Sequence, residues 1–432
     1  MDYNRIEVSS KRLSSGSTGV AIMTLAKGTL GVGILTLPYK TMLGGVPIYL
    51  LLLLATAFLT VKSVEMIAHG ARKTHKFVFE EITEALLGRG VSLLLGISLL
   101  VNCYGSAVIY LIAIGDALRS LSVNVTFTLN PVELSSMLTV LVGLSFAVIS
   151  LVNHVGTLWF LSLAGLVGVL ITVVSLIYVL SICGISTTLS EPPALGTMDS
   201  IMRARGRWID DVGLVSTLTF ALCNQYNVAQ VLGELGDISE ANARRVAFAS
   251  TAIPVAVYIP TAVMGYLSYG FSVENNILKN FAPMVAQGDW IIRLGIGAVI
   301  LSVMTCAILN TQAMRLSVFY LLPAGSQGRR WVQFLVTLVI SGTPIVIAII
   351  YPNISSLLDL VGAGAGCIMC LIVPALISLS LESQHRTSRN RFFWFCKCLV
   401  SHPIEWFMII GGILLGIFGT IFELYNCFKR PK

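Results

Sequence analysis

Long apolar stretches alternate with short polar ones along the whole chain, and the charged residues mark where each apolar stretch begins and ends. A helix needs about 20 mostly apolar residues to cross a membrane. Eleven stretches are predicted to do so. They are residues 19–37, 41–61, 90–115, two helices within 134–190 that are separated by Asn153 and His154, and residues 212–233, 246–273, 294–314, 331–351, 354–381 and 406–422.

The polar stretches between the predicted spans are short, which indicates one polytopic membrane domain of the all-α class. Residues 1–17 are polar and are expected to form a disordered cytosolic tail. The remaining divisions are residues 18–190 with spans one to five, an outer loop at 191–208, residues 209–381 with spans six to ten, and residues 382–432 with an inner loop, the eleventh span and a short tail.

Composition agrees with a membrane location, since 56% of the residues are hydrophobic and only 11% are charged, against about a quarter in soluble proteins. The net charge of +7 follows from the loops and gives no reason to expect nucleic acid as a partner. The sequence holds no H-x-x-H pair, no G-x-S-x-G and no phosphate-binding loop. We therefore expect no enzyme activity, no cofactor and no metal site.

Lys and Arg favour an orientation with the amino terminus in the cytosol, because they concentrate in inner loops. Arg203, Arg205 and Arg207 in the predicted outer loop go against this assignment. Asn124 begins an Asn-Val-Thr glycosylation pattern in a loop placed outside, which agrees with it. No sorting signal chooses between the plasma membrane and a lysosome-like or vacuolar membrane, and a monomer is the default state.

The first span contains features that disrupt a helix at membrane depth. Gly28, Gly31 and Gly33 weaken it, and Lys27 carries a charge that costs about 2.5 to 3.5 kcal/mol at the centre of a membrane helix. Broken backbone is tolerated there only where it is buried or lines a cavity. The sequence therefore predicts an interrupted helix. The alternatives are close helix packing by the glycines and a Lys27 side chain that extends to the membrane interface.

A second interruption is predicted in the sixth span, where Asn224, Gln225 and Asn227 follow in near succession. Transporters built from inverted repeats carry broken helices at corresponding places in their two halves. Half-helix amino termini suit a carboxylate, and exposed carbonyls suit a cation, so the pair of breaks suits a zwitterionic amino acid. Hydrogen bonding between intact helices is the alternative explanation of the amides.

Five segments, taken in order, resemble the amino acid/auxin permease family of the APC superfamily. GVGILTLPY at 31–39 looks like its first-helix pattern, and FALCNQYNVAQVLGEL at 220–235 is similar to the sixth-helix run of the sodium-coupled neutral amino acid transporters. The others are FEEITEALLGRG at 79–90, YLIAIGD at 110–116 and LLDLVGAGAG at 357–366, which Pro374 follows. The resemblance implies a LeuT-like fold with two inverted five-helix repeats and an eleventh helix.

The same resemblance implies an amino acid binding site at the two interruptions. Thr29, Gly31 and Gly33 would meet the substrate carboxylate, whereas the amino group and side chain would lie against a second set of residues. That set is Phe220, Asn224 and Gln225, with either Tyr104 or Tyr110 closing over the site.

Lys27 departs from the sodium-coupled pattern, which has Asn at this position. The resemblance implies that its ammonium takes the place of sodium, with Ser302 and Thr305 as the other half of the ion site. KGTLGVGIL looks instead like the KGNIGTGLL run of the proton-assisted transporters. Besides Lys27, Asp359 and two further carboxylates, Asp116 and Glu234, are candidate proton carriers, unless they lie at helix ends and face water.

These features together predict a secondary active amino acid symporter in the lipid bilayer that is coupled to protons or at least independent of sodium. Sodium-coupled symport is the alternative within the same class. An amino acid sensor with little flux is the alternative from another class. No acidic residue is placed securely in the middle of a span, which favours neutral amino acids as substrates.

Overall fold

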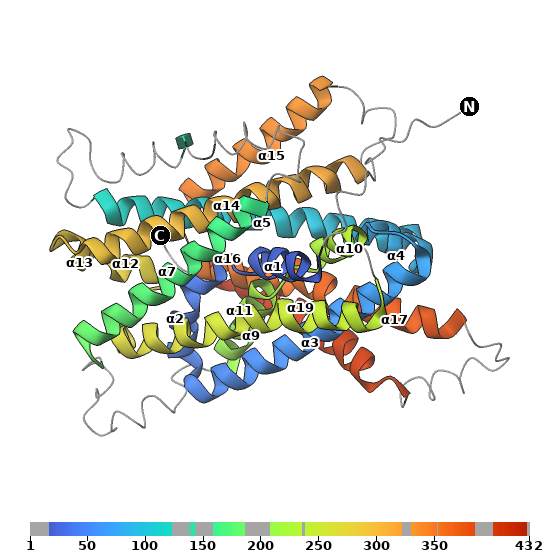
Figure 1. Cartoon of the computed structure of the whole chain (residues 1–432), viewed down its shortest axis with the longest axis horizontal. Helices are drawn as coiled ribbons and strands as arrows, with labels where there is room; N and C mark the ends of the chain where they lie inside the picture. Colours follow the sequence, from blue (N-terminus) through green and yellow to red (C-terminus); the bar gives the residue numbers. More distant parts are fainter. Residues whose placement is uncertain are drawn as a thin grey trace.

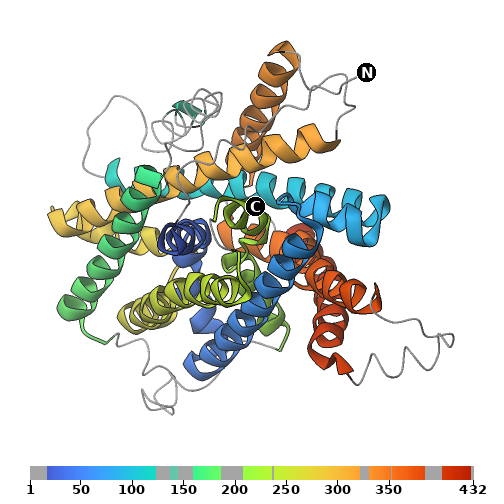
Figure 2. The ribbon, with the colours of Figure 1, turned by 45° about the vertical axis from the view of Figure 1, so that its right-hand side comes forward.

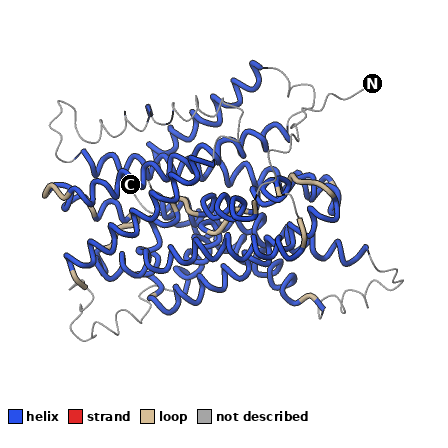
Figure 3. Tube along the Cα trace, viewed as in Figure 1, coloured by secondary structure: helices blue, strands red, loops and turns tan. Residues whose placement is uncertain are grey.

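Helices make up almost all of the described part of the protein, and no strand occurs there (Figure 3). The computed structural model describes residues 17–122, 159–185, 208–235, 238–321, 330–351, 353–384 and 401–429, with four single positions between 137 and 143. Residues 1–16 of the predicted tail, most of the fourth span, most of the outer loop and the glycosylation pattern at Asn124 lie outside these residues.

Among the described residues, helices lie at the predicted positions of the third, fifth and later spans, and the sixth is divided into two. Their bounds are α1 Thr18–Thr29, α2 Gly33–Gly44, α3 Val46–Thr74, α4 Phe79–Leu87, α5 Arg89–Leu121, α7 Trp159–Cys183, α9 Trp208–Ala221, α10 Gln225–Glu234, α11 Glu240–Tyr269, η4 Gly270–Ser272, α12 Ile277–Asn280, α13 Ala282–Ala286, α14 Trp290–Leu321, α15 Arg330–Ile350, α16 Ile354–Val361, η5 Gly362–Gly366, η6 Ile368–Ile372, α17 Val373–Gln384 and α19 Pro403–Lys429.

Seven helical spans among the described residues are long and apolar enough to cross a membrane, or eight when α1 and α2 are counted as one bent span. The halves α9 and α10 and the shorter apolar helix α15 come in addition to these. The protein is therefore an all-helical, multi-pass membrane protein. The count of eleven spans stays a prediction, because the fourth lies outside the described residues.

The boundary between the first two spans differs from the prediction. The sequence places an end at residue 37 and a new span at 41, but the chain remains helical through Gly44, and α3 continues to Thr74. Lys40 explains the error. A lysine in an apolar sequence indicates the end of a span, but the side chain of this one is buried inside the protein. α3 also continues past the predicted end at residue 61. Lys62 and Glu65, just beyond that point, form an ion pair one helical turn apart that suits a helix.

Two long helices, α5 and α14, run side by side through the molecule (Figures 1 and 2), and α7 packs along α14. On the other side of α1 lie α11 and α3, so the bent pair α1 and α2 is enclosed between two groups of helices. This enclosure places the interruption between α1 and α2 in the interior, where Leu30 and Val32 are buried and Gly31 keeps part of its surface accessible.

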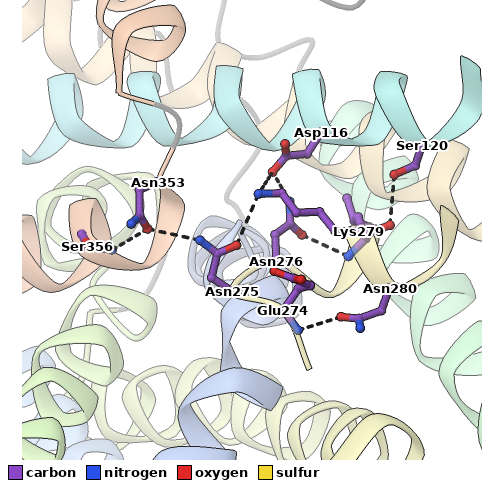
Figure 4. Close-up of polar contacts among 10 residues, drawn as sticks. Asp116, Ser120, Glu274, Asn275, Asn276, Lys279, Asn280, Asn353 and Ser356 are labelled. Atoms are coloured by element: carbon purple, nitrogen blue, oxygen red, sulfur yellow. Dashed lines mark hydrogen bonds and ion pairs between the residues drawn. The ribbon is translucent and has the colours of Figure 1, made fainter. Parts of the chain in front are cut away.

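The connection between α11 and α14 is held to the ends of two spans by side chains (Figure 4). Asp116, near the end of α5, accepts a hydrogen bond from Asn276 at 2.8 Å and lies 3.6 Å from the Lys279 ammonium group. Asn275 donates to Asn353, the residue that caps the first turn of α16. Asp116 therefore has a local role in fixing this connection.

The span from α16 to α17 contains two wide helical turns, η5 and η6. Wide turns of this kind are rare and relieve crowding or re-aim side chains. Gly362 begins η5, and a Cβ atom at this position would overlap the carbonyl oxygen of Ser216 in α9. The glycine thus allows α9 and η5 to touch backbone to backbone, as small residues do in membrane helices.

Replacing Gly362 with alanine is expected to destabilise the protein by about 1 to 3 kcal/mol, because the added methyl group must push two backbones apart. Thermal unfolding of the purified protein measures the change. Gly411→Ala in α19 is the matched control, since a Cβ atom there meets nothing within 4 Å. Equal melting temperatures for the two variants would show that η5 and α9 are not in tight contact.

Candidate functional site

The first span is interrupted at Leu30–Val32, where its axis turns by 58° between α1 and α2. The Gly31 N–H donates to the Thr29 carbonyl at 2.9 Å, a bond that does not continue a helix. The interruption expected from the glycines is present. Close packing is present as well, because a Cβ atom on Gly33 would lie 2.7 Å from the Cβ of Ala221 in α9.

The sixth predicted span is also interrupted, at residues 222–224 between α9 and α10. The two interruptions lie against each other. Asn224 donates from its side-chain amide to the Leu25 carbonyl at 2.5 Å, and a Cβ atom on Gly28 would lie 2.8 Å from the Asn224 Oδ1. Asn224, one of the three predicted amides, therefore joins the two broken helices directly.

Tyr258 of α11 joins the two interruptions from the side. Its hydroxyl lies 2.8 Å from the Thr29 carbonyl and 2.9 Å from the Ala221 carbonyl, the last residues of α1 and α9. A hydroxyl has one proton, so the two carbonyls share it. Tyr49 of α3 in turn donates to the Tyr258 carbonyl at 3.2 Å. These bonds satisfy carbonyls that the helix ends would otherwise leave without partners in the interior.

Gln225 begins α10 and lies fully buried. Its Oε1 accepts from the Asn224 N–H at 2.9 Å and from the Cys370 thiol at 3.1 Å. Its Nε2 has no hydrogen-bond partner among the described residues. A buried donor without a partner costs free energy, so Gln225 is suited to donate to a bound molecule.

Lys27, near the end of α1, is completely buried, which excludes a side chain extended to the interface. Its ammonium group lies 3.1 Å from the Leu30 carbonyl, 2.9 Å from the Ser302 hydroxyl and 3.2 Å from the Ser302 carbonyl. Its fourth contact is the Cys306 sulfur at 3.1 Å. Lys27 forms no ion pair with a described residue. The ammonium group is therefore a cation held by carbonyl and hydroxyl oxygens from the end of α1 and from α14.

Thr305 contributes to the Lys27 site indirectly, through Ser302. Its hydroxyl donates to the Ser302 carbonyl at 2.7 Å, the same carbonyl that contacts Lys27. Gly165 of α7 closes the other side, because a Cβ atom there would overlap the Lys27 side chain and the Thr305 hydroxyl. The backbone of α7 thus lies directly against the ammonium group and shields it from water.

Tyr110 of α5 approaches the first interruption, with its hydroxyl 3.3 Å from where a Cβ atom of Gly31 would lie. Tyr104 packs against the main core and against the small cluster of Cys103, Met314 and Ile340. Of the two tyrosines proposed from the sequence, the structure thus brings Tyr110 to the glycines. Phe220 is buried at the end of α9, close to Gly362.

Thr29 has two roles in the first interruption, since its hydroxyl donates to the Leu25 carbonyl at 3.0 Å and its own carbonyl accepts from Tyr258. The Thr29 side chain also lines a small cavity with room for one water molecule. The other polar residues around this cavity are Thr60, Asn224, Ser250 and Thr251.

Asp359 of α16 does not face water, contrary to one alternative left by the sequence. It is buried, pairs with Lys40 of α2, and accepts a hydrogen bond from the Thr217 hydroxyl of α9. A carboxylate at membrane depth needs such partners because an isolated buried charge is costly. Lys40 and Asp359 therefore neutralise each other at a junction of three helices.

Four residues of the site were missed from the sequence: Lys40, Gly165, Tyr258 and Cys306. Lys40 carried a signal, because a lysine only two residues after the GVGILTLP pattern lies too close to Lys27 for both to be at membrane surfaces. Tyr258 is one of several tyrosines in spans, and nothing in its neighbours distinguishes it. Gly165 and Cys306 depend on contacts between distant helices.

A multi-pass helical protein with two interrupted helices joined around a buried cation belongs to the class of membrane transport proteins. Residues 14–422 match the family described as transmembrane amino acid transporter protein, and the chain is therefore a member of that family. The family consists of transporters and not of enzymes. Amino acid transport is accordingly the activity that the family supports.

Named relatives agree over most of the chain. It is 26% identical to the amino acid transporter AVT6E of Arabidopsis thaliana, over 98% of this chain and 86% of the relative. It is 23% identical to a putative sodium-coupled neutral amino acid transporter 11 of Danio rerio, over 88% of this chain and 82% of the relative. It is 22% identical to sodium-coupled neutral amino acid symporter 2 of Danio rerio, over 86% and 76%.

Removing one partner of the buried pair is expected to be costly. Asp359→Asn and Lys40→Met should each lower the free energy of unfolding by about 3 to 5 kcal/mol, because each leaves a charge buried alone. The double variant should lose less than the sum of the two.

The partly exposed pair Lys62 and Glu65 is the control, and Lys62→Met should cost less than about 1 kcal/mol. Thermal and denaturant unfolding measure all four variants. Additive losses in the double variant would show that Lys40 and Asp359 do not interact.

Proposed function

We propose that the protein is a secondary active amino acid transporter that works by alternating access, with a LeuT-like arrangement of two inverted five-helix repeats. The two interruptions, which correspond in position within residues 18–190 and 209–381, support this arrangement. The amino acid binds where they meet. Its carboxylate faces the backbone at Gly31 and Gly33, and its amino group and side chain lie near Phe220, Asn224 and Gln225, under Tyr110.

The Lys27 ammonium takes the place at which sodium-coupled transporters hold sodium. The observation that carries this proposal is the contact of Lys27 with the Leu30 carbonyl and with both oxygens of Ser302. Carbonyl and hydroxyl oxygens from a broken helix and a neighbouring span are the ligands expected of such a cation site. Transport is then independent of sodium, and Lys27 is the first candidate to bind and release the coupling proton.

Asp359 is a weaker candidate for proton coupling because Lys40 already neutralises it. The ion pair between Lys40 and Asp359 also affects which amino acids the site can bind. Since Asp359 is occupied and Lys27 adds a positive charge, the described residues around the interruptions offer no free carboxylate to a cationic side chain. Neutral zwitterionic amino acids fit this site best.

Sodium-coupled symport is the second candidate function. The observation in its favour is that two of the relatives carry names that refer to sodium coupling. Under this alternative, a sodium ion would bind at another place, because Lys27 fills the space between α1 and α14.

Uptake into proteoliposomes distinguishes the two. Labelled neutral and cationic amino acids are offered with an inward proton gradient and an inward sodium gradient imposed separately, with choline replacing sodium. Accumulation driven by protons alone supports the proposal. Accumulation that requires sodium supports the alternative, and binding without uptake would instead indicate a sensor.

Lys27→Ala is expected to reduce uptake by at least about tenfold, because a charge-assisted hydrogen bond contributes roughly 1.5 to 3 kcal/mol and several are lost. Lys62→Ala, which removes a partly exposed lysine from α3, is the control and should transport normally. Both variants are compared at equal amounts of folded protein. Normal uptake and normal pH dependence in Lys27→Ala would refute the role of this ammonium.

A further inference from the structure

The short helix α4 connects α3 to α5 and presents two chemically different faces. Its apolar face, with Phe79 and Ile82, packs into the cluster formed by α3, α10 and α17. The fit to α3 is close, because a Cβ atom on Gly70 would lie 3.0 Å from the Ile82 side chain. Its other face carries Glu80 and Glu84 toward α5 and α14.

Glu80 is buried, although it lies outside the membrane spans. One of its carboxylate oxygens accepts from the Ser317 hydroxyl of α14 at 3.2 Å. Its backbone carbonyl accepts from the Ser92 hydroxyl of α5 at 2.7 Å, and Ser92 also hydrogen-bonds to Tyr320. Tyr320 in turn donates to Glu84 at 3.0 Å. Three of these polar contacts attach α4 to α5 and α14, and the fourth, between Ser92 and Tyr320, joins α5 to α14.

No cation balances Glu80, which forms no ion pair with a described residue. Burial raises the pKa of the Glu80 carboxyl above its ordinary value, the backbone N–H of Glu80 itself and the Ser317 hydroxyl lower it in part, and the neighbouring Glu81 raises it further. Cys103 of α5 and Tyr320 of α14 also lie within electrostatic reach. From α3, α10 and α17, no titratable side chain among the described residues hydrogen-bonds to Glu80.

We propose that Glu80 is a proton-binding site that controls the attachment of α4 to α14. The protonated carboxyl remains buried against Ser317. The ionised carboxylate has its own backbone N–H and one hydroxyl, but no cation among the described residues, to replace its water, so it draws α4 away from α14 toward solvent. The step moves one proton between solvent water and the Glu80 carboxyl, and no covalent bond of the chain changes.

The position of α4 gives this site a consequence for transport. On one side α4 contacts α3 and α10, and α10 is half of the second interrupted span. On the other side it contacts α5 and, through Glu80 and Glu84, α14, the helix that supplies Ser302 to Lys27. Protonation of Glu80 therefore holds these two groups of helices together at one end. This consequence, unlike the proton site itself, rests on the proposed alternating access.

Thermal unfolding of the full chain between pH 5 and 8 tests the proton site without any transport measurement. Because the folded-state pKa is raised, the protonated carboxyl contributes stability that is complete in acid and is lost as the pH rises through that pKa. Glu80→Gln, which stays neutral, should lack this loss, so its melting temperature relative to wild type should rise with pH. Glu81→Gln, a change at an exposed neighbour on the same helix, should keep the pH-dependent loss, with at most a small downward shift of its midpoint.

Ser317→Ala provides a second test that does not alter the carboxyl. Loss of the hydroxyl removes a hydrogen bond that only the attached, protonated form keeps, so the midpoint of the pH-dependent step should shift downward, by up to about one pH unit. Hydrogen exchange of residues 79–87, corrected for the intrinsic effect of pH, should accelerate above the midpoint in wild type and not in Glu80→Gln.

Identical pH profiles for wild type and Glu80→Gln, or an unshifted midpoint in Ser317→Ala, would overturn the proposal. Uptake as a function of the pH on the side of α4 then tests the consequence for transport. A pH step that is present in unfolding and in exchange but absent from uptake would leave the proton site standing and would count against its link to alternating access.

Discussion

Every polar backbone group that a broken helix exposes inside a membrane protein needs a partner, and the centre of this structure is arranged around that constraint. The carbonyls of Leu25, Thr29 and Leu30, at the end of the first broken helix, accept from three different side chains: Asn224, Tyr258 and Lys27. These side chains come from α10, α11 and the broken helix itself. The interruption thus depends on hydrogen bonds from neighbouring segments. Because one of these bonds comes from Asn224, the two broken helices are coupled to each other.

The two buried lysines of the first span are neutralised in different ways. Lys40 meets a carboxylate, so the pair with Asp359 carries no net charge and joins α2 to α16. Lys27 meets only neutral oxygens and a thiol, so a whole positive charge remains beside the proposed binding site. An uncompensated cation attracts the carboxylate of an incoming substrate, whereas a closed ion pair has no such effect.

The sequence predicted much of the architecture because glycines, amides and lysines are conspicuous in apolar stretches. The interruptions near Gly31 and Asn224 and the contact of Lys27 with Ser302 were expected, whereas the end of the first span was wrong. Lys40 explains that error, because a charge in the sequence does not reveal whether a carboxylate more than 300 residues away will neutralise it. Tyr258 and Gly165 were not predictable, since their importance arises from tertiary contacts that leave no local pattern.

Gly165 has a consequence for the timing of proton movement. Because the backbone of α7 lies directly against the Lys27 ammonium group, water reaches that nitrogen only when α7 withdraws from α14 and α1. Acid and base groups exchange protons with water much faster than helices move, and collective helix motions take microseconds to milliseconds. The moments at which water meets the Lys27 ammonium group, which any proton exchange there requires, are then set by the motion of a helix.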